Sequence, residues 1–331
     1  MAAVAVVQTA FIGDVILATP LLESARKTHP DKTVVAVVRS GCENLLGNNP
    51  YVDEIITWDK KGEDSGIAGI FRIAKKLSRF RIKTVLIPHR SFRSGMALFL
   101  SGAKERIGFD RGGGVCFHTR SVHYRLGLHE VERNLMLAKE AGWEWKGLKP
   151  AIFPDDKDKV LVDEILGGND PFCVFAPGSV WPTKMWPGEY YRETGEYFSK
   201  KGLRVVISGG KDEKEICTKL AEDIPGALNL CGLFTLRQSG ELYRRSRFVL
   251  TGDTAPQHLA AAMGAVVYSI FGPTISRFGF WPYTEKGTVI ETDVSCRPCG
   301  VHGHKTCPNR TYQCMRRITS EEVVGIIEKT L

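Results

Sequence analysis

Asp14 is the first acidic residue of the chain, and it follows an apolar run at the N-terminus. Residues 4–10 are typical of a buried strand, and residues 20–27 are typical of a helix. A carboxylate between a strand and a helix could cap a turn or the helix. It could also be a general base, because a carboxylate within hydrogen-bonding reach can take a proton from a substrate hydroxyl. This segment alone leaves both interpretations open.

A second candidate site follows the strand expected at 247–253. Asp253, Thr254 and Ala255 lead into a helix of small residues, whose first amides are unpaired and attract phosphate. His258 lies about one turn into that helix, where it could donate to a phosphate oxygen or simply pack. Asp253 or Thr254 alone would most simply be a cap. The combination with a following strand and the sequence Phe-Gly-Pro-Thr favours an anion site.

A third candidate site is the loop after the strand expected at 172–178. Gly178, Ser179, Thr183 and Lys184 supply a backbone turn, two hydroxyls and one cation ahead of a helix, which suits an anionic ligand. A proline-rich surface loop is the alternative. The chain has no Walker A motif and no GxGxxG after a strand. Kinases, ATPases and ordinary nicotinamide-dependent enzymes are therefore disfavoured.

The elements that must position these residues alternate between strands and helices. Further strands are expected at 33–39, 54–58, 83–89, 203–210 and 265–273, and further helices at 69–80, 93–103, 188–200, 212–222, 236–245 and 256–263. Continuous valine- and isoleucine-rich strands between helices predict an α/β fold with two doubly wound parallel sheets. Prolines and charges around 146–170 mark a junction, which divides the chain into domains 1–155 and 156–331. Ligands bind at the carboxyl ends of such strands, where two facing sheets would form a cleft.

The charge of the chain is uneven. Residues 1–150 hold 23 Lys+Arg against 15 Asp+Glu, whereas residues 151–331 hold 22 against 22. This excess in the first half suggests an anionic partner, which could be nucleic acid, an anionic membrane surface or an acidic substrate, although a solvated surface is the simpler alternative. No apolar run is long enough to cross a bilayer, and the N-terminus lacks a basic leader. We therefore expect a cytoplasmic protein.

The C-terminal region gathers four cysteines within 19 residues: Cys296, Cys299, Cys307 and Cys314, with His302 and His304 between them. Because a cytoplasmic protein rarely forms disulfides, these residues are either free thiols or metal ligands. The CxxC pair followed by two more cysteines has zinc-like spacing. A structural zinc and a set of unliganded thiols remain equally good interpretations.

Together, these motifs resemble those of glycosyltransferase family 9, the ADP-heptose:lipopolysaccharide heptosyltransferases. The resemblance rests on GDVILATP near the start, PGSVWPTKMWP, GDTAPQHLAAAMG with FGPT, and CMRRITSEEV near the end. The PTKMWP loop looks more like that of the heptosyltransferase II branch. The resemblance implies two Rossmann-like domains in the GT-B arrangement. Residues 1–155 would bind the acceptor, and residues 156–331 would bind the nucleotide sugar.

The resemblance also implies roles for single residues. Asp14 matches the family's general base, and Lys184, Ser179 and the helix start at Thr254–Ala255 would stabilise the ADP leaving group. The implied reaction inverts the anomeric centre in one displacement without a catalytic metal. Arg90, Arg93 and Arg133, with Arg111 as a further candidate, are expected to bind carboxylates and phosphates of the acceptor. No carboxylate can be assigned to the donor ribose.

The expected function is transfer of heptose from ADP-heptose to the lipopolysaccharide inner core, at the inner face of the inner membrane. The alternatives are a family 9 transferase that uses another nucleotide sugar and a non-catalytic protein that binds nucleotide sugars. The presence of Asp14 argues against the second. A nucleic-acid binder would fit the basic half, but no nucleic-acid motif supports it.

Overall fold

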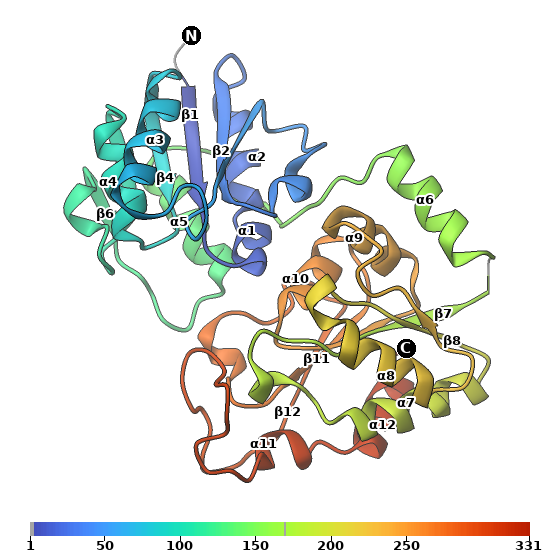
Figure 1. The fold of residues 1–331 in the computed structure, drawn as a ribbon. Helices are drawn as coiled ribbons and strands as arrows, with labels where there is room; N and C mark the ends of the chain where they lie inside the picture. The colour runs from blue at the N-terminus through green and yellow to red at the C-terminus, as the bar shows by residue number, and fades with distance from the viewer. Residues whose placement is uncertain (1–2, 169) are drawn as a thin grey trace. The chain divides into compact units, whose positions relative to one another are not determined.

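The computed structural model describes residues 3–168 and 170–331. The chain divides into two compact units, Met1–Phe153 and Pro154–Leu331. Each unit is a parallel sheet covered by helices on both faces (Figure 1). Among the described residues, no helix combines the length and the apolar character that a bilayer span requires.

The first unit has six parallel strands in the order β3-β2-β1-β4-β5-β6. The strands are β1 (Ala3–Gln8), β2 (Thr33–Arg39), β3 (Glu54–Trp58), β4 (Ile82–Ile87), β5 (Glu105–Phe109) and β6 (Arg120–Val122). The helices are α1 (Ile12–Leu17), α2 (Thr19–Thr28), α3 (Gly66–Ser78), α4 (Phe92–Leu100) and α5 (Glu130–Glu140), with short 3₁₀ turns η1 (Glu43–Leu46) and η2 (Val115–Phe117). All six residues of β1 are buried, as expected for a central strand covered on both faces.

The helices of the first unit form two layers. Helices α3 and α4 pack together over one face of the sheet, where Ile70, Ile73 and Leu77 of α3 join the core. Helix α2 packs against α5, and α1 contacts both of them. The strand order reverses direction at β1 and β4, so the carboxyl ends of these two central strands flank the position where ligands bind in such sheets.

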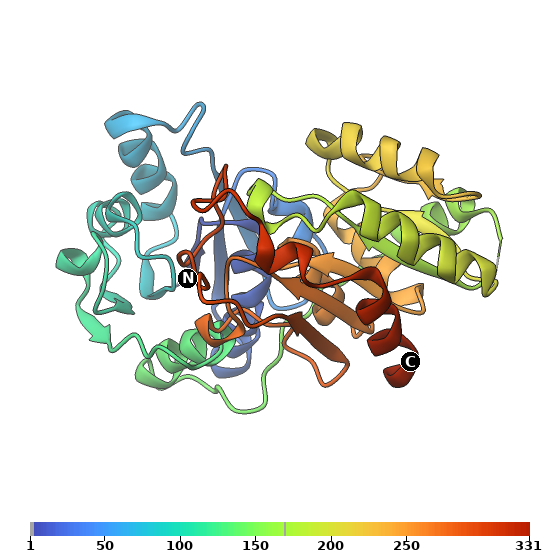
Figure 2. The ribbon, with the colours of Figure 1, turned by 90° about the horizontal axis from the view of Figure 1, so that it is seen from below.

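The second unit repeats this design with the strand order β12-β11-β10-β7-β8-β9. Its strands are β7 (Phe172–Ala176), β8 (Arg204–Ile207), β9 (Leu228–Asn229), β10 (Val249–Gly252), β11 (Val267–Phe271) and β12 (Gly287–Glu291). Its helices are α6 (Asp156–Leu166), α7 (Gly188–Lys200), α8 (Lys214–Asp223), α9 (Leu236–Arg245), α10 (Ala255–Ala262), α11 (Gln313–Arg316) and α12 (Ser320–Thr330), with 3₁₀ turns η3 (Pro182–Lys184), η4 (Lys211–Glu213) and η5 (Ser276–Phe278). Near the C-terminus, α12 packs against α7 (Figure 2).

The predicted α/β class with two doubly wound parallel sheets is confirmed. One local expectation was wrong. The first helix begins at Ile12 instead of Pro20, so Asp14 lies inside α1 and not in a turn before a helix. The boundary between the two units lies at Phe153–Pro154, inside the expected junction at 146–170. Helix α6 follows it and is capped by Asp155, whose Oδ1 accepts a hydrogen bond from the amide of Asp158 at 2.8 Å.

Candidate active site

Asp14 is the third residue of α1 and lies just beyond the carboxyl end of β1. Its Oδ2 accepts a hydrogen bond from the backbone N–H of Phe11 at 3.2 Å, so the carboxylate does cap the helix start. This bond occupies one of the two carboxylate oxygens. Burial, followed by the negative charge of Glu130, raises the pKa of Asp14 to about 7, although its side chain keeps some contact with solvent. A carboxyl group with this pKa can exchange protons near neutral pH, as a general base must.

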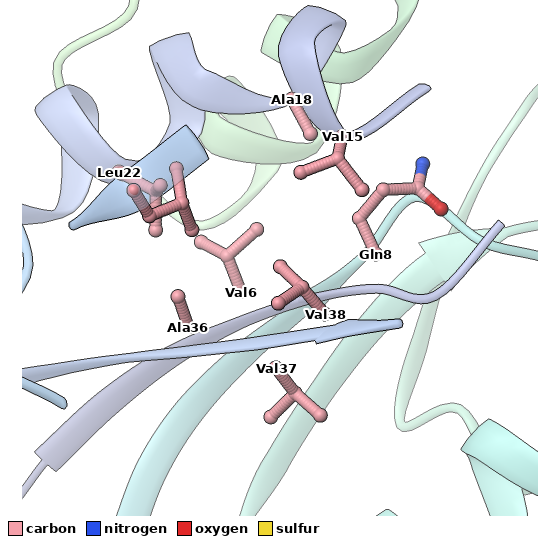
Figure 3. Close-up of a pocket in the computed structure, with 9 residues that line it drawn as sticks. Val6, Gln8, Val15, Ala18, Leu22, Ala36, Val37 and Val38 are labelled. Carbon is pink, nitrogen blue, oxygen red and sulfur yellow. The ribbon is translucent and has the colours of Figure 1, made fainter. Parts of the chain in front are cut away.

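Helix α1 is anchored by apolar packing on the side that faces the sheet. Val15 and Ala18 point toward Val6 and Val38 across a small apolar cavity between α1 and strands β1 and β2 (Figure 3). On the other side, the Asn134 side chain of α5 donates to the last backbone carbonyl of α1 at 3.2 Å. This packing fixes the position of Asp14 at the end of β1.

Three arginines gather around the ring of Tyr124. The guanidinium carbons of Arg90, Arg133 and Arg111 lie 4.5, 4.6 and 5.8 Å from the ring centroid. Arg133 is only 1% exposed, and its Nε donates to Glu130 at 2.7 Å. In this structure Arg133 therefore supports the cluster from inside and is not presented to a ligand as the sequence suggested. Arg90 and Arg111 are exposed.

Lys60 follows β3 and forms a polar cluster that the sequence did not reveal. Its ammonium donates to the hydroxyls of Thr9 at 2.6 Å and Ser94 at 2.8 Å, with Ser91 further away at 3.4 Å. Burial, followed by the charge of Arg93, lowers the pKa of Lys60 to about 7. Arg93 itself donates to the backbone carbonyl of Lys60 at 3.0 Å. Among the described residues, the Lys60 ammonium contacts hydroxyls and has no carboxylate partner.

In the second unit, Asp253 joins three segments into one network. Its Oδ2 accepts from Lys184 Nζ at 2.5 Å and from Thr274 Oγ1 at 2.7 Å, and its Oδ1 accepts from Gln257 Nε2 at 2.8 Å. The four residues are buried. Lys184 also donates to the backbone carbonyl of Asp253 at 3.1 Å. The structure therefore brings together the predicted Lys184 and Asp253 and adds Thr274 and Gln257.

The segment predicted to bind an anion forms the start of α10. Thr254 occupies the cap position, but its side chain makes no capping bond and lies 3.3 Å from the hydroxyl of Thr251 instead. Pro256 has no N–H, and the Gln257 amide donates to the backbone carbonyl of Thr254 at 3.2 Å. The Ala255 amide has no such partner among the described residues. His258 is buried, and its Nδ1 has no hydrogen-bond partner among the described residues. Burial lowers the pKa of His258 to about 4, so the imidazole is neutral.

The other predicted donor-loop residues lie beside this network. Ser179 Oγ accepts from the Trp181 amide at 3.1 Å, and Gly178 leaves no room for a side chain because Glu213 fills that space. Glu213 lies on η4, after β8, where its Oε2 accepts from the Gly210 amide at 2.7 Å. Burial raises the pKa of Glu213. Glu213 therefore places a carboxylate beside Gly178 and Gly210, after the ends of β7 and β8, where the sequence assigned none.

The cysteine-rich segment packs directly on the donor loop. Thr183 Oγ1 donates to the backbone carbonyl of His304 at 3.0 Å and accepts from its amide at 2.7 Å. Thr183 therefore serves to attach this segment. The rings of Trp181 and His302 stack with centroids 6.2 Å apart. The segment consequently holds the loop that carries Lys184.

The four cysteines lie near one another without forming a metal cradle. Burial, followed by the charges of the other three thiols, raises the pKa of Cys314 to about 11. Cys296 and Cys299 are partly exposed, whereas Cys307 is buried. Across residues 3–168 and 170–331, no three His, Cys, Asp or Glu side chains form a group that could hold a metal ion. The described side chains therefore show no assembled zinc site.

Comparison with known proteins agrees with this geometry. A sequence profile of glycosyltransferase family 9 (heptosyltransferase) matches residues 70–312. The chain is 29% identical to lipopolysaccharide heptosyltransferase 1 of Pseudomonas aeruginosa over 325 residues, which cover 94% of this chain and 88% of that protein.

Solved structures show the same fold. A family 9 glycosyltransferase from Veillonella parvula superposes with a TM-score of 0.87 at 22% identity, covering 99% of this chain and 96% of the other. The ADP-heptose lps heptosyltransferase II of Escherichia coli gives a TM-score of 0.80 at 22% identity, covering 99% and 98%. The predicted GT-B fold is thereby confirmed. Because the family profile spans well over half of the chain, the protein belongs to glycosyltransferase family 9 and is a glycosyltransferase.

Proposed function

We propose that this enzyme transfers a heptose from ADP-heptose to a saccharide of the lipopolysaccharide inner core. The observation that carries the proposal is Asp14, a carboxylate with a pKa of about 7 at the end of β1 in a family 9 chain. A relative named for heptose transfer to lipopolysaccharide supports the choice of substrates. The likeness of the PTKMWP loop to the heptosyltransferase II branch stays a prediction.

In the proposed reaction, Asp14 accepts the proton of the acceptor hydroxyl as this oxygen attacks the anomeric carbon of the donor. The bond from the anomeric carbon to the diphosphate breaks in the same displacement, and ADP leaves with the bonding electron pair. Because attack and departure occur on opposite sides of the carbon, the anomeric configuration inverts. The hydrogen bond from the Phe11 amide to Asp14 Oδ2 would hold the carboxylate in place during this step.

The second unit is proposed to hold ADP. The Ala255 amide at the start of α10 would bind the diphosphate, and Lys184 would add a positive charge as negative charge develops on the leaving group. Lys184 is neutralised by Asp253 in the structure, so the ammonium would be shared between Asp253 and the diphosphate. We further propose that His258 donates to a phosphate oxygen and that Glu213 accepts from the ribose hydroxyls.

The acceptor is proposed to bind the first unit through its anionic groups. Arg90 and Arg111 are exposed beside Tyr124, and the Lys60 cluster offers an amino group with no carboxylate partner among the described residues. Arg93 borders this cluster. These groups suit phosphates or carboxylates on the sugar acceptor. Because such an acceptor is lipid-linked, the enzyme would work at an anionic membrane surface.

No step of this proposal uses a metal, and any zinc at the four cysteines would be structural. Elemental analysis and thiol titration of the protein purified without chelator test that site. One zinc per chain and a melting temperature that falls on chelation would support it. Four titratable thiols and no metal would assign the segment to packing alone.

A donor panel tests the proposed function most broadly. The purified protein is incubated with a truncated lipopolysaccharide core and, in separate reactions, with ADP-heptose and other nucleotide sugars. Mass spectrometry should show an acceptor enlarged by one heptose only with ADP-heptose. Transfer from a different nucleotide sugar would correct the donor, and nucleotide-sugar binding without any transfer would favour a non-catalytic binding protein.

A further inference from the structure

The outer surface of helices α3 and α4 exposes several large apolar side chains. Ile67 and Phe71 on α3, with Phe92, Phe99 and Leu100 on α4, each leave between 40% and 68% of their surface accessible. We call this surface the α3–α4 face. A gathering of exposed aromatic and aliphatic side chains on two neighbouring helices is a sign of an interaction site.

These side chains are not needed to fill the core beneath them. Helix α3 already buries Ile70, Ile73 and Leu77 against the sheet, and Ile67 and Phe71 lie outside this buried stripe. Helix α4 buries Ser94, Gly95, Ala97 and Leu98, while its large aromatic residues stay outside. Phe92 and Phe99 contact the ring of Phe117 on η2, with centroids 5.1 and 5.9 Å apart, yet each leaves about half of its surface accessible.

Cations surround these apolar groups. Residues 66–106 contain ten Lys+Arg and a single acidic residue, Glu105. Lys75 and Lys76 continue the exposed side of α3, and neither forms an ion pair with any residue that the structure describes. The guanidinium of Arg106 lies 5.5 Å from the ring centroid of Phe99, so cationic and apolar groups are interleaved.

The α3–α4 face also borders the residues proposed for the acceptor. Helices α3 and α4 lie side by side (Figures 1 and 2). Both follow parallel strands, so both begin at the carboxyl edge of the sheet, where Lys60 lies. Phe92 stands between Ser91 and Arg93, and both of these residues contact Lys60.

We propose that the α3–α4 face docks on an anionic phospholipid bilayer. Phe71, Phe92 and Phe99 would enter the boundary between headgroups and acyl chains, and Lys75 and Lys76 would lie among the lipid phosphates. A second copy of the chain fits this surface less well, because a symmetric contact would bring cations of the same sign together. The inference rests on the proposed function for its purpose, since a lipid-linked acceptor would then reach the adjacent Lys60 cluster.

Vesicle sedimentation tests this proposal without any sugar transfer. The full-length protein is mixed with vesicles of phosphatidylcholine alone or with a third of phosphatidylglycerol, at low and high salt. We expect binding to the anionic vesicles that weakens with salt. Lys75→Glu/Lys76→Glu should reduce partitioning by roughly fivefold or more per residue, and Phe71→Ser/Phe99→Ser should also reduce it.

Matched controls separate this face from general charge and hydrophobicity. Lys219→Glu/Lys329→Glu changes the net charge equally in the second unit, and Val160→Ser removes an exposed apolar group from α6. Both should bind vesicles like the parent. All variants should keep the parent melting temperature and the parent rate on a water-soluble, lipid-free acceptor. If the parent itself failed to transfer sugar to the lipid-free acceptor, the proposed function would be contradicted, but membrane docking would not.

Three results would overturn the proposal. The parent could fail to bind anionic vesicles, or the α3–α4 variants could bind them as well as the parent does. The variants could instead change the oligomeric state in size-exclusion chromatography with unchanged vesicle binding, which would make the face a contact between copies.

Discussion

The Asp14 carboxylate caps the start of α1, and we propose that it also accepts the proton of the acceptor hydroxyl. Its bond to the Phe11 amide stabilises the start of α1, whereas its raised pKa suits proton transfer. The two roles need different properties of the side chain: capping needs an acceptor oxygen, and catalysis needs a basic one. Asparagine keeps the acceptor oxygen and removes the basicity, so the two roles can be separated by substitution.

We expect Asp14→Asn to gain stability relative to the parent as pH rises. The carboxyl titrates near pH 4 in the unfolded chain and near 7 in the folded protein. The folded state therefore binds more protons between these values, and the parent loses stability as pH rises from about 4 to about 7. Thermal unfolding at pH 4.5 and 7.5 should show the variant's advantage growing with pH. Asp14→Ala also loses the cap, which costs about 1 kcal/mol at both pH values. A pH-independent difference between Asp14→Asn and the parent would disagree with the raised pKa.

At the proposed donor site, substitutions can separate an effect on ADP binding from an effect on stability. Lys184→Ala and His258→Ala should each weaken ADP binding, since a charge-assisted hydrogen bond contributes roughly 1.5–3 kcal/mol, a factor of about ten or more. Lys184→Ala should also lower the melting temperature because it leaves Asp253 without its cation. His258→Ala has no such ion pair to lose and is the cleaner probe. Isothermal titration calorimetry with ADP is the measurement, and unchanged affinity in both variants would remove these residues from the donor site.

At the scale of elements, Arg297 connects the cysteine-rich segment to the donor site. It is 7% exposed in its side chain, and its guanidinium donates to the backbone carbonyls of Gly272 at 2.5 Å and Thr274 at 2.7 Å. The hydroxyl of Thr274 in turn donates to Asp253. We infer that Arg297 is a positioning residue for the donor network.

Arg297→Ala should therefore raise KM for the donor several-fold and leave KM for the acceptor unchanged. A merely structural loss would lower the amount of active enzyme without this selectivity. Arg317→Ala, an exposed residue on the same segment, is the control and should match the parent. Equal changes in both KM values, or none in either, would contradict a positioning role.

The sequence predicted the positions of individual strands better than it predicted which side chains come into contact in the folded protein. Long runs such as residues 33–39 and 54–58 were placed correctly because apolar, β-branched segments are distinctive. Helix α1 was missed because Ile12, Val15 and Ile16 have weak helix propensity, and burial against β1 outweighs it.

The same limit applies within the site. Lys184 and Asp253 were both proposed, but the sequence could not show that they pair across 69 positions. Lys60 could not be singled out from the sequence, because what distinguishes it is contact with hydroxyls and with no carboxylate in the described part of the chain. The ion pair of Arg133 could have been predicted from the sequence, because Glu130 stands three residues earlier on the same helix, at the spacing of an ion pair.

At the scale of the molecule, the excess positive charge belongs to one unit. Residues 151–153 are uncharged, so Met1–Phe153 holds 23 Lys+Arg against 15 Asp+Glu and Pro154–Leu331 holds 22 against 22. This division fits a first unit that binds the more anionic partner. No such asymmetry would be needed if both substrates were held mainly by fixed amides.

We therefore expect salt to act selectively on the acceptor. Raising ionic strength from about 0.05 to 0.5 M should increase KM for a water-soluble, phosphorylated acceptor and change KM for the donor much less, because exposed charges are screened more than buried ones. Steady-state kinetics at several salt concentrations measure both constants. A donor KM that rises as steeply as the acceptor KM would mean that the charge of the first unit does not act on the acceptor.

The most direct test of the central claim is the pH dependence of sugar transfer in the parent and in Asp14→Asn. We predict that kcat/KM of the parent rises with pH through about 7 and then levels, since only the ionised carboxylate of the free enzyme can accept the proton. Asp14→Asn should be slower by about 10²–10⁴-fold and should lose this rise, while ADP affinity stays close to that of the parent. Parent-like transfer by Asp14→Asn would contradict the account and leave Asp14 as the cap of α1.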